Sequence, residues 1–249
     1  MKNKPLIEVV CYSVESAIAA QGGGADRVEL CGGLTEGGTT PSSGTIEAAR
    51  KHLTIDLFVM IRPRSGDFLY SDVEFDIMKR DIEDCKRTGV DGVVLGMLNA
   101  EGSVDKPRCR EFVRLAAPLH ATFHRAFDMA RDPMEALENI IECGFGRILT
   151  SGQERTAQDG ASLIARLIDK AAGRIVIMPG CGIHRDNLRD VIDRTGAAEF
   201  HISALKATAS SMRHRNPKVG IGSTQTASEY EVLRTDENLV REMVQLSRK

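Results

Sequence analysis

Polar and ionisable residues, together with two glycines, recur within or just after short apolar runs of this sequence. The set comprises Cys11, Glu29, Cys31, Arg62, Arg64, His124, Arg125, Asp128, Gly180, Gly182, Glu199, His201 and Ser203. Histidine and carboxylates move protons near neutral pH, and arginine holds anions through charge-assisted hydrogen bonds. Cysteine thiolates are ligands for soft metals. The set is therefore suited to three kinds of chemistry: proton transfer, anion binding and soft-metal binding.

The candidates for proton transfer are His124, Asp128 and Glu29, with His201 as a further titratable group. No lysine follows an apolar run before Lys206, so a Schiff-base mechanism is not expected. The alternative is that some of these charged groups only form ion pairs inside the core.

An anion site is the second possibility. Gly180 and Gly182 follow the seventh apolar run, and Ser203 belongs to the eighth. In barrels the last two strand-to-helix loops often bind phosphate, and glycines let backbone N–H groups approach the anion. Arginines at two other strand ends, Arg62 and Arg64 at the third and Arg125 at the fifth, would add positive charge. The alternative is that the glycines only allow tight turns.

Two cysteines could form a metal site. Cys11 and Cys31 end the first and second apolar runs, and neighbouring strands lie about 4.8 Å apart. Two thiolates at that separation could share a soft ion such as Cu(I). The alternative is that both are small buried core residues. Because side chains alternate along a strand, at most one of Glu8 and Cys11 points into a barrel.

Short apolar strands alternate with helices along the chain. The expected strands are Leu6–Cys11, Arg27–Cys31, Asp56–Arg62, Gly92–Gly96, Ala121–Arg125, Arg147–Thr150, Arg174–Met178 and Glu199–Ser203. The expected helices are Val14–Gln21, Ser42–His52, Asp72–Arg87, Lys106–Ala117, Pro133–Cys143, Asp159–Ala172, His184–Arg194 and Asp236–Ser247. Strands that are apolar on both faces are typical of a parallel sheet covered by helices.

Eight such repeats in 249 residues predict an α/β fold, a (β/α)8 TIM barrel, with any site at the carboxyl ends of the strands. We expect one domain over residues 1–249, with the barrel in 1–204 and an irregular arm plus terminal helix in 205–249. The segment Ala204–Glu229 lacks periodicity, which is typical of a functional or assembly segment or of a surface loop.

The bulk properties exclude several classes of partner. A net charge of −2 and a pI of about 6.3 argue against nucleic acid. The first residues lack the apolar core of a signal peptide, and no apolar run is long enough to span a membrane. We therefore expect a cytoplasmic protein without a membrane or nucleic-acid partner, and no disulfide framework among its six cysteines.

Several motifs resemble one known family. These are Glu29-Leu30-Cys31, the run from Glu36 to Ser42, the run from Arg62 to Phe68, the run from Thr122 to Asp128, and Met212 to Asn216. They are similar to the CutC family of copper homeostasis proteins, although Ser65 stands where that family usually has glycine. The resemblance implies a TIM barrel, a cytoplasmic location, Cu(I) bound through Cys11 and Cys31, and a homo-oligomer, dimer or tetramer, in which Ala204–Glu229 serves assembly.

Three functional hypotheses follow. The first is a Cu(I)-binding copper homeostasis protein. The second is a barrel enzyme that acts on a small anionic or phosphorylated metabolite. The third is a scaffold in which the polar strand ends have only structural roles.

Overall fold

The computed structural model describes residues 4–216, 218–219 and 229–248. Its barrel strands are β1 (Leu6–Cys11), β2 (Arg27–Leu30), β3 (Asp56–Met60), β4 (Gly92–Leu95), β5 (His120–Phe123), β6 (Arg147–Thr150), β7 (Val176–Pro179) and β8 (Glu199–Ile202). Its α-helices are α1 (Val14–Gly22), α2 (Ser43–His52), α3 (Asp72–Thr88), α4 (Lys106–Ala116), α5 (Pro133–Cys143), α6 (Ala161–Ala171), α7 (Leu188–Thr195) and α8 (Glu237–Ser247). Short 3₁₀ helices, η1 (Leu34–Glu36) and η2 (Arg125–Met129), follow β2 and β5.

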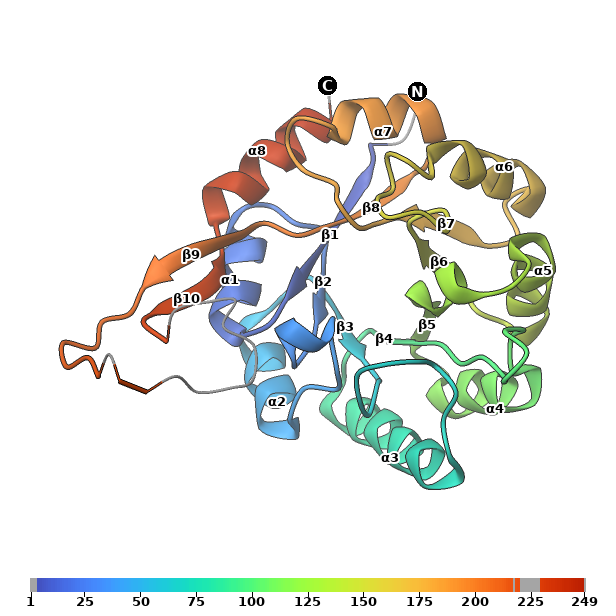
Figure 1. The fold of residues 1–249 in the computed structure, drawn as a ribbon, viewed down its shortest axis with the longest axis horizontal. Coiled ribbons are helices and arrows are strands. Elements are labelled where there is room, and N and C mark those ends of the chain that lie inside the picture. The colour runs from blue at the N-terminus through green and yellow to red at the C-terminus, as the bar shows by residue number, and fades with distance from the viewer. Residues whose placement is uncertain (1–3, 217, 220–228, 249) are drawn as a thin grey trace.

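The eight strands form one parallel sheet in the order β7-β6-β5-β4-β3-β2-β1-β8. The sheet curls until β7 and β8, its two edges, lie next to each other, and the helices surround it (Figure 1). This is the expected (β/α)8 TIM barrel. The strand and helix bounds differ from the expected ones by a few residues; β3, for example, ends at Met60 rather than at Arg62.

The strands are buried on both sides because two apolar clusters meet at the sheet. The larger cluster, which includes Ile7, Val9 and Cys11 of β1, also holds the inner faces of the helices. The smaller cluster contains Val10, Cys31 and Phe58, with Met60 and Val94, and fills the interior of the barrel. Successive residues of β1 therefore alternate between the helices and the interior, as strand geometry requires.

Local sequence signals set the helix ends. Ser71 and Glu74 form a capping box at the start of α3, in which each side chain accepts a hydrogen bond from the other residue's backbone N–H. Gly89 ends the same helix with a φ of +75°, a conformation that glycine adopts without steric cost. Pro133 follows its cap Asp132 at the start of α5.

The segment expected to be irregular contains strand structure. Strands β9 (Leu205–Ala209) and β10 (Glu231–Thr235) pair as an antiparallel ribbon that projects beyond the barrel (Figure 1). Its base docks on α1, where the Thr235 backbone N–H donates to Ser16 Oγ at 3.2 Å. The expectation of an irregular arm was therefore wrong for Leu205–Ala209 and for Glu231–Thr235. Positions 217 and 220–228 of that segment lie outside the described residues.

Helix α8 agrees with the expected terminal helix and begins after Asp236, whose side chain accepts hydrogen bonds from two backbone N–H groups. It packs between α1 and α7 (Figure 1). Within the described part of the chain, no helix is both long enough and apolar enough to cross a membrane.

Candidate functional site

A cavity of about 570 Å³ opens at the carboxyl end of the barrel. Its walls come from the ends of β1 and β2 and from the loops after β2, β3, β5, β7 and β8. The lining residues are Val10, Tyr12, Glu29, Cys31, Glu36, Gly37, Met60, Arg62, Phe68, His124, Arg125, Leu149, Cys181, Gly182, Ile183, His184, His201 and Ser203. Apolar side chains thus surround a few ionisable groups, the usual composition of a small-molecule site.

His124 is a neutral hydrogen-bond donor in this cavity. The Ala126 backbone N–H donates to His124 Nδ1 at 3.2 Å, so the single ring hydrogen of the neutral imidazole lies on Nε2. Burial, together with the nearby charge of Arg62, lowers the pKa of His124 to about 3. The ring packs close to Gly96, at which an added Cβ would lie 2.6 Å from Nδ1.

Glu29 is a carboxylate with a raised pKa. Burial, aided by the nearby Glu8, raises the pKa of Glu29 to about 7, although His201 acts in the opposite direction. The Cys31 thiol donates to Glu29 Oε2 at 3.5 Å, whereas Oε1 has no hydrogen-bond partner within the described ranges. A carboxyl group with this pKa is present in both protonation states near neutral pH, as a general base requires.

Arg62 is fixed by backbone carbonyl groups rather than by a carboxylate. Its Nη1 donates to Glu36 O and Gly38 O at 2.8 and 2.9 Å, and its Nη2 donates to Gly66 O at 2.9 Å. Its Nε has no hydrogen-bond partner in the described part of the chain. Because no carboxylate of the described residues forms an ion pair with it, the guanidinium brings a net positive charge to the cavity.

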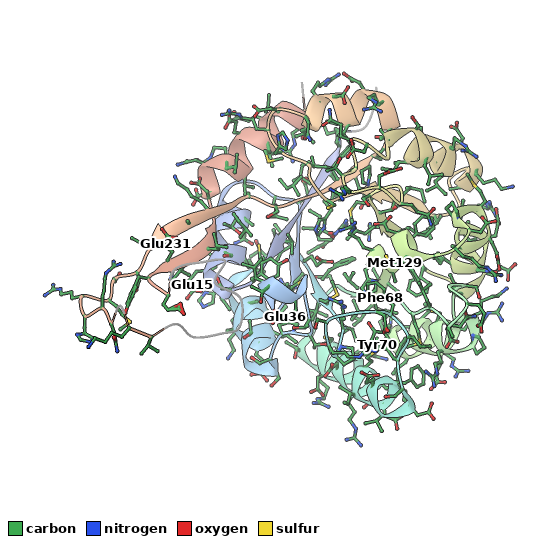
Figure 2. All side chains as sticks on the ribbon, in the orientation of Figure 1. Glu15, Glu36, Phe68, Tyr70, Met129 and Glu231 are labelled. Atoms are coloured by element: carbon green, nitrogen blue, oxygen red, sulfur yellow. The ribbon has the colours of Figure 1, made fainter. Side chains whose placement is uncertain are left out.

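The ring of Phe68 covers both of these donors. Its centroid lies 4.9 Å from that of His124 and 5.1 Å from the guanidinium carbon of Arg62. Figure 2 labels Phe68 and, two residues later, Tyr70, in the loop between β3 and α3. The aromatic ring thus shields the donors from water, which strengthens the hydrogen bonds that they form.

A buried ion network lies below the cavity. Glu8 is paired with Arg27, and Arg27 Nη2 also donates to Glu199 Oε2 at 2.6 Å. Arg147 Nε donates to the same Glu199 oxygen at 2.6 Å. His201 joins this network to the cavity, because its Nδ1 lies 2.6 Å from Glu8 Oε1 and its Nε2 lies 3.8 Å from Glu29 Oε2.

Three of these groups, Glu8, Glu29 and His201, each present a possible metal-ligand atom within 4.8 Å of the other two. However, Glu8 already binds Arg27 through Oε2 and His201 through Oε1. The geometry of the group is therefore that of a hydrogen-bonded network.

Asp128 holds the loop after β6. Its carboxylate accepts from the Ser151 backbone N–H and from the hydroxyl groups of Ser151 and Thr150. It also accepts from Arg125 Nε at 2.8 Å. These bonds use both oxygens of Asp128, and Asp128 does not line the cavity. This residue, a candidate acid or base from the sequence, therefore positions Arg125. Arg125 lines the cavity with its side chain 42% exposed.

The remaining anion-site candidates separate into two groups. Gly182, with a φ of +69°, and Ser203 line the cavity together with Arg62 and Arg125. Arg64 lies outside it, because its guanidinium binds Asp67 and Glu74 and packs on the ring of Tyr70. Gly180 lies beneath the lining, where an added Cβ would come within 2.4 Å of Leu149 Cδ1.

The structure does not bring the two candidate metal thiols into one group. Cys31 faces the cavity, whereas Cys11 packs in the outer cluster, with its Sγ 3.8 Å from Thr235 Oγ1. Cys11 is aligned with Leu30 in the β1–β2 register, and aligned residues of parallel strands point to the same face. Burial raises the pKa of Cys11 to about 12, and burial and Glu29 raise that of Cys31 well above its usual value. These two residues therefore do not fit a shared Cu(I) ion held by thiolates.

Sequence reasoning missed some groups at the site. Glu8 and Arg27 were not among the candidates, although strand alternation allowed Glu8 to point inward. Tyr12, Phe68 and His184 also line the cavity. The available signal was the alternation along β1, which places Glu8 on the inner face once Cys11 lies on the outer one.

Comparison with known proteins decides the family. The model of the CutC family matches residues 5–206. The chain belongs to the CutC family. The human copper homeostasis protein cutC homolog is 51% identical to this CutC chain over 236 residues, which cover 95% of this chain and 86% of the human protein. A CutC family protein of Chromobacterium violaceum is 50% identical, with 95% of each chain covered.

Solved structures agree with the fold. The crystal structure of a copper homeostasis protein CutC from Streptococcus agalactiae superposes with a TM-score of 0.76 at 32% identity, covering 79% of this CutC chain and 97% of that one. Phosphoribosylanthranilate isomerase from Thermotoga maritima superposes with a TM-score of 0.57 at 12% identity, covering 98% of each chain. The latter similarity concerns the barrel fold alone.

Proposed function

We propose that the cavity is the active site of an enzyme that moves a proton on a small anionic metabolite. One observation carries the proposal. Glu29 Oε1, Arg62 Nε and His124 Nε2 are buried, have no hydrogen-bond partner among the described residues, and belong to residues that line this one cavity. Each such atom costs about 1–3 kcal/mol when left unpaired, so a ligand that pairs with all three would recover that free energy.

The protonation states support a division of roles. Glu29, with a pKa of about 7, is the group that takes a proton from carbon. His124 and Arg62 offer N–H groups to an adjacent carbonyl oxygen, which becomes negative as that proton leaves. A carboxylate base with a neutral imidazole donor is an established combination for proton abstraction next to a carbonyl group.

The cavity's mouth supports an anionic substrate. Arg125 is partly exposed there and donates to Asp128 and Ser151 through Nε and one Nη. Gly182 and Ser203 line the same cavity and belong to the loops after β7 and β8. In this fold these loops commonly hold phosphate. A volume of about 570 Å³ suits a small phosphorylated or carboxylated metabolite.

A thermal-shift screen of phosphorylated and carboxylated carbonyl metabolites tests this function. A ligand at about 100 times its Kd stabilises by about 2.7 kcal/mol, which corresponds to about 5–10 °C in Tm for a chain of this size. We expect Arg125→Gln and His124→Gln to reduce that shift and Arg64→Gln, whose side chain lies outside the cavity, to preserve it. The proposal fails if no metabolite raises Tm, or if all three variants respond as the wild type does.

A role in copper handling is the second proposal, and the printed name of the relatives supports it. An anaerobic Cu(I) titration against a competing chelator, with wild type, Cys11→Ser and Cys31→Ser, tests it. Loss of binding in both variants would support the shared pair, and loss in Cys31→Ser alone would support copper in the cavity. Weak binding by the wild type would contradict both. A cytoplasmic location and a dimer or tetramer remain predictions.

A further inference from the structure

We infer that His201, held by Glu8, is the proton partner of Glu29, and that this pair stores one proton between them for the reaction in the cavity. The inference rests on the proposed function and names a second catalytic group for it. It is carried by the arrangement of Glu8, His201 and Glu29 on the adjacent strands β8, β1 and β2.

Glu8 fixes the orientation and tautomer of the imidazole. Arg27 and His201 outweigh the effect of burial and lower the pKa of Glu8 to about 2, so Glu8 is an ionised acceptor at neutral pH. Nδ1 of His201, 2.6 Å from Glu8 Oε1, must therefore carry a hydrogen. The nitrogen that can gain or lose a proton is Nε2, which faces Glu29 Oε2 at 3.8 Å.

Charge balance fixes the number of protons on the pair. The guanidinium groups of Arg27 and Arg147 offset the carboxylates of Glu8 and Glu199, with which they are paired. The pair formed by Glu29 and His201 is then neutral only when it holds one titrating proton, either on Glu29 or on His201 Nε2. Both other states would leave an uncompensated buried charge, which is strongly unfavourable.

The groups that act on His201 come from two neighbouring strands. Burial and the charge of Arg27 lower the pKa of His201, whereas Glu29 and Glu8 raise it. The two carboxylates have the larger effect, so the pKa of His201 is raised overall. Cys31 and Tyr12, which lie near Glu29, have raised pKa values and stay protonated at neutral pH. The shared proton therefore has two sites available to it, the Glu29 carboxylate and His201 Nε2.

In the reactive state the stored proton lies on His201 Nε2, so Glu29 is ionised. The C–H bond next to the substrate carbonyl breaks and the proton bonds to Glu29, while the C–H electron pair forms a C=C bond and the C=O π pair moves to the oxygen. The pair of Glu29 and His201 then holds two protons, and its positive charge offsets the negative charge on that oxygen. Return of the proton from Glu29 to carbon restores the starting state.

Nitrogen-15 NMR of the imidazole groups tests this inference without a substrate. Chelator-treated wild type, Glu29→Gln and His201→Gln would be titrated from pH 5 to 9, with His201→Gln used to assign the signals and the exposed His52 as an internal reference. We expect Nδ1 of His201 to stay protonated throughout. We expect Nε2 to bind its proton at least tenfold more tightly in the wild type than in Glu29→Gln.

Two results would overturn the inference. One is a neutral His201 that carries its ring hydrogen on Nε2, and the other is a titration of Nε2 that Glu29→Gln does not change. A Zn²⁺ addition that shifts the His201 signals at stoichiometric metal in the wild type, but not in Glu29→Gln, would assign the group to metal binding and would also overturn it. Because no ligand is involved, these outcomes are independent of whether the metabolite screen succeeds.

Discussion

Arg27 and Glu8 form an ion pair in which both side chains are almost completely removed from solvent, at 2% and 1% exposure. The second oxygen of Glu8 binds His201 at 2.6 Å. One carboxylate thus neutralises a buried guanidinium and orients an imidazole at the floor of the cavity. The stability of the barrel and the order of the site depend on the same residue.

Replacing Glu8 should be costly. Glu8→Gln removes the negative charge opposite Arg27, and loss of one partner of a buried pair typically costs about 3–5 kcal/mol. The matched control is Glu138→Gln, which breaks a surface pair with Arg174 and should lower the free energy of unfolding far less, because water screens an exposed pair. Urea unfolding of both variants measures the difference. Equal losses would show that the Arg27 pair contributes no more than a surface pair.

The buried neutral state of His124 predicts a pH effect on stability. Its folded pKa of about 3 lies below the usual value, so as pH falls the unfolded chain binds a proton that the folded protein does not. Protonation of this histidine in the unfolded chain should therefore lower the free energy of unfolding of the wild type by about 2 kcal/mol between pH 7 and pH 5. Glu29 acts in the opposite direction. Because its pKa is raised in the folded protein, the folded state binds this proton at a higher pH than the unfolded chain does, which stabilises the fold as pH falls.

The comparison with a variant isolates the His124 contribution, because Glu29 is common to both proteins. The free energy of unfolding of His124→Gln, measured in urea at pH 7 and pH 5, should improve relative to the wild type by about 2 kcal/mol at the lower pH. Parallel pH profiles would mean that His124 is not held in the neutral form.

Gly96 should be intolerant of a side chain. A Cβ there would lie 2.6 Å from His124 Nδ1 and 2.8 Å from Cε1, so Gly96→Ala must displace the ring and its bond from Ala126. Such overpacking costs about 1–3 kcal/mol, and ligand-induced stabilisation should fall with it. Gly44→Ala, in α2 with nothing within 4 Å, should instead be neutral or stabilising by up to about 1 kcal/mol. Wild-type ligand response in Gly96→Ala would contradict the role of His124.

Thiol labelling should report on the cavity. All six cysteines are free and described, and each is buried except Cys181, which lines the cavity. A thiol reagent should modify one group rapidly in the native protein and six after denaturation, and Cys181→Ser should abolish the rapid phase. A ligand in the cavity should slow that phase. Rapid modification of several thiols, or no protection by a stabilising ligand, would contradict this placement.

The fold was accessible from sequence because its signals are local. Caps such as Ser71 and glycine ends such as Gly89 mark the helices, and two-sided apolar runs mark the strands. The ribbon of β9 and β10 was not accessible, since its strands are separated by more than twenty residues and are largely exposed. Pairing between such distant segments leaves no local pattern.

The site was accessible only in part. Alternation along the first strand correctly predicted that Glu8 and Cys11 would not both point into the barrel, since Cys11 packs in the outer cluster and Glu8 binds His201. It did not reveal the register that aligns Cys11 with Leu30, and this register turns the first thiol toward the helices. The Glu8 network was missed because its partners, Arg27, Glu199 and His201, come from three distant parts of the chain.

Hydrogen exchange at carbon tests the central claim most directly. Each carbonyl metabolite that raises Tm would be incubated in D₂O with the wild type or with Glu29→Gln, and proton NMR would follow the C–H signal next to the carbonyl group. The account predicts loss of that signal with the wild type and none, or at least a hundredfold slower loss, with Glu29→Gln. A bound metabolite that keeps its C–H signal in the wild type, or loses it equally fast in both proteins, would contradict it.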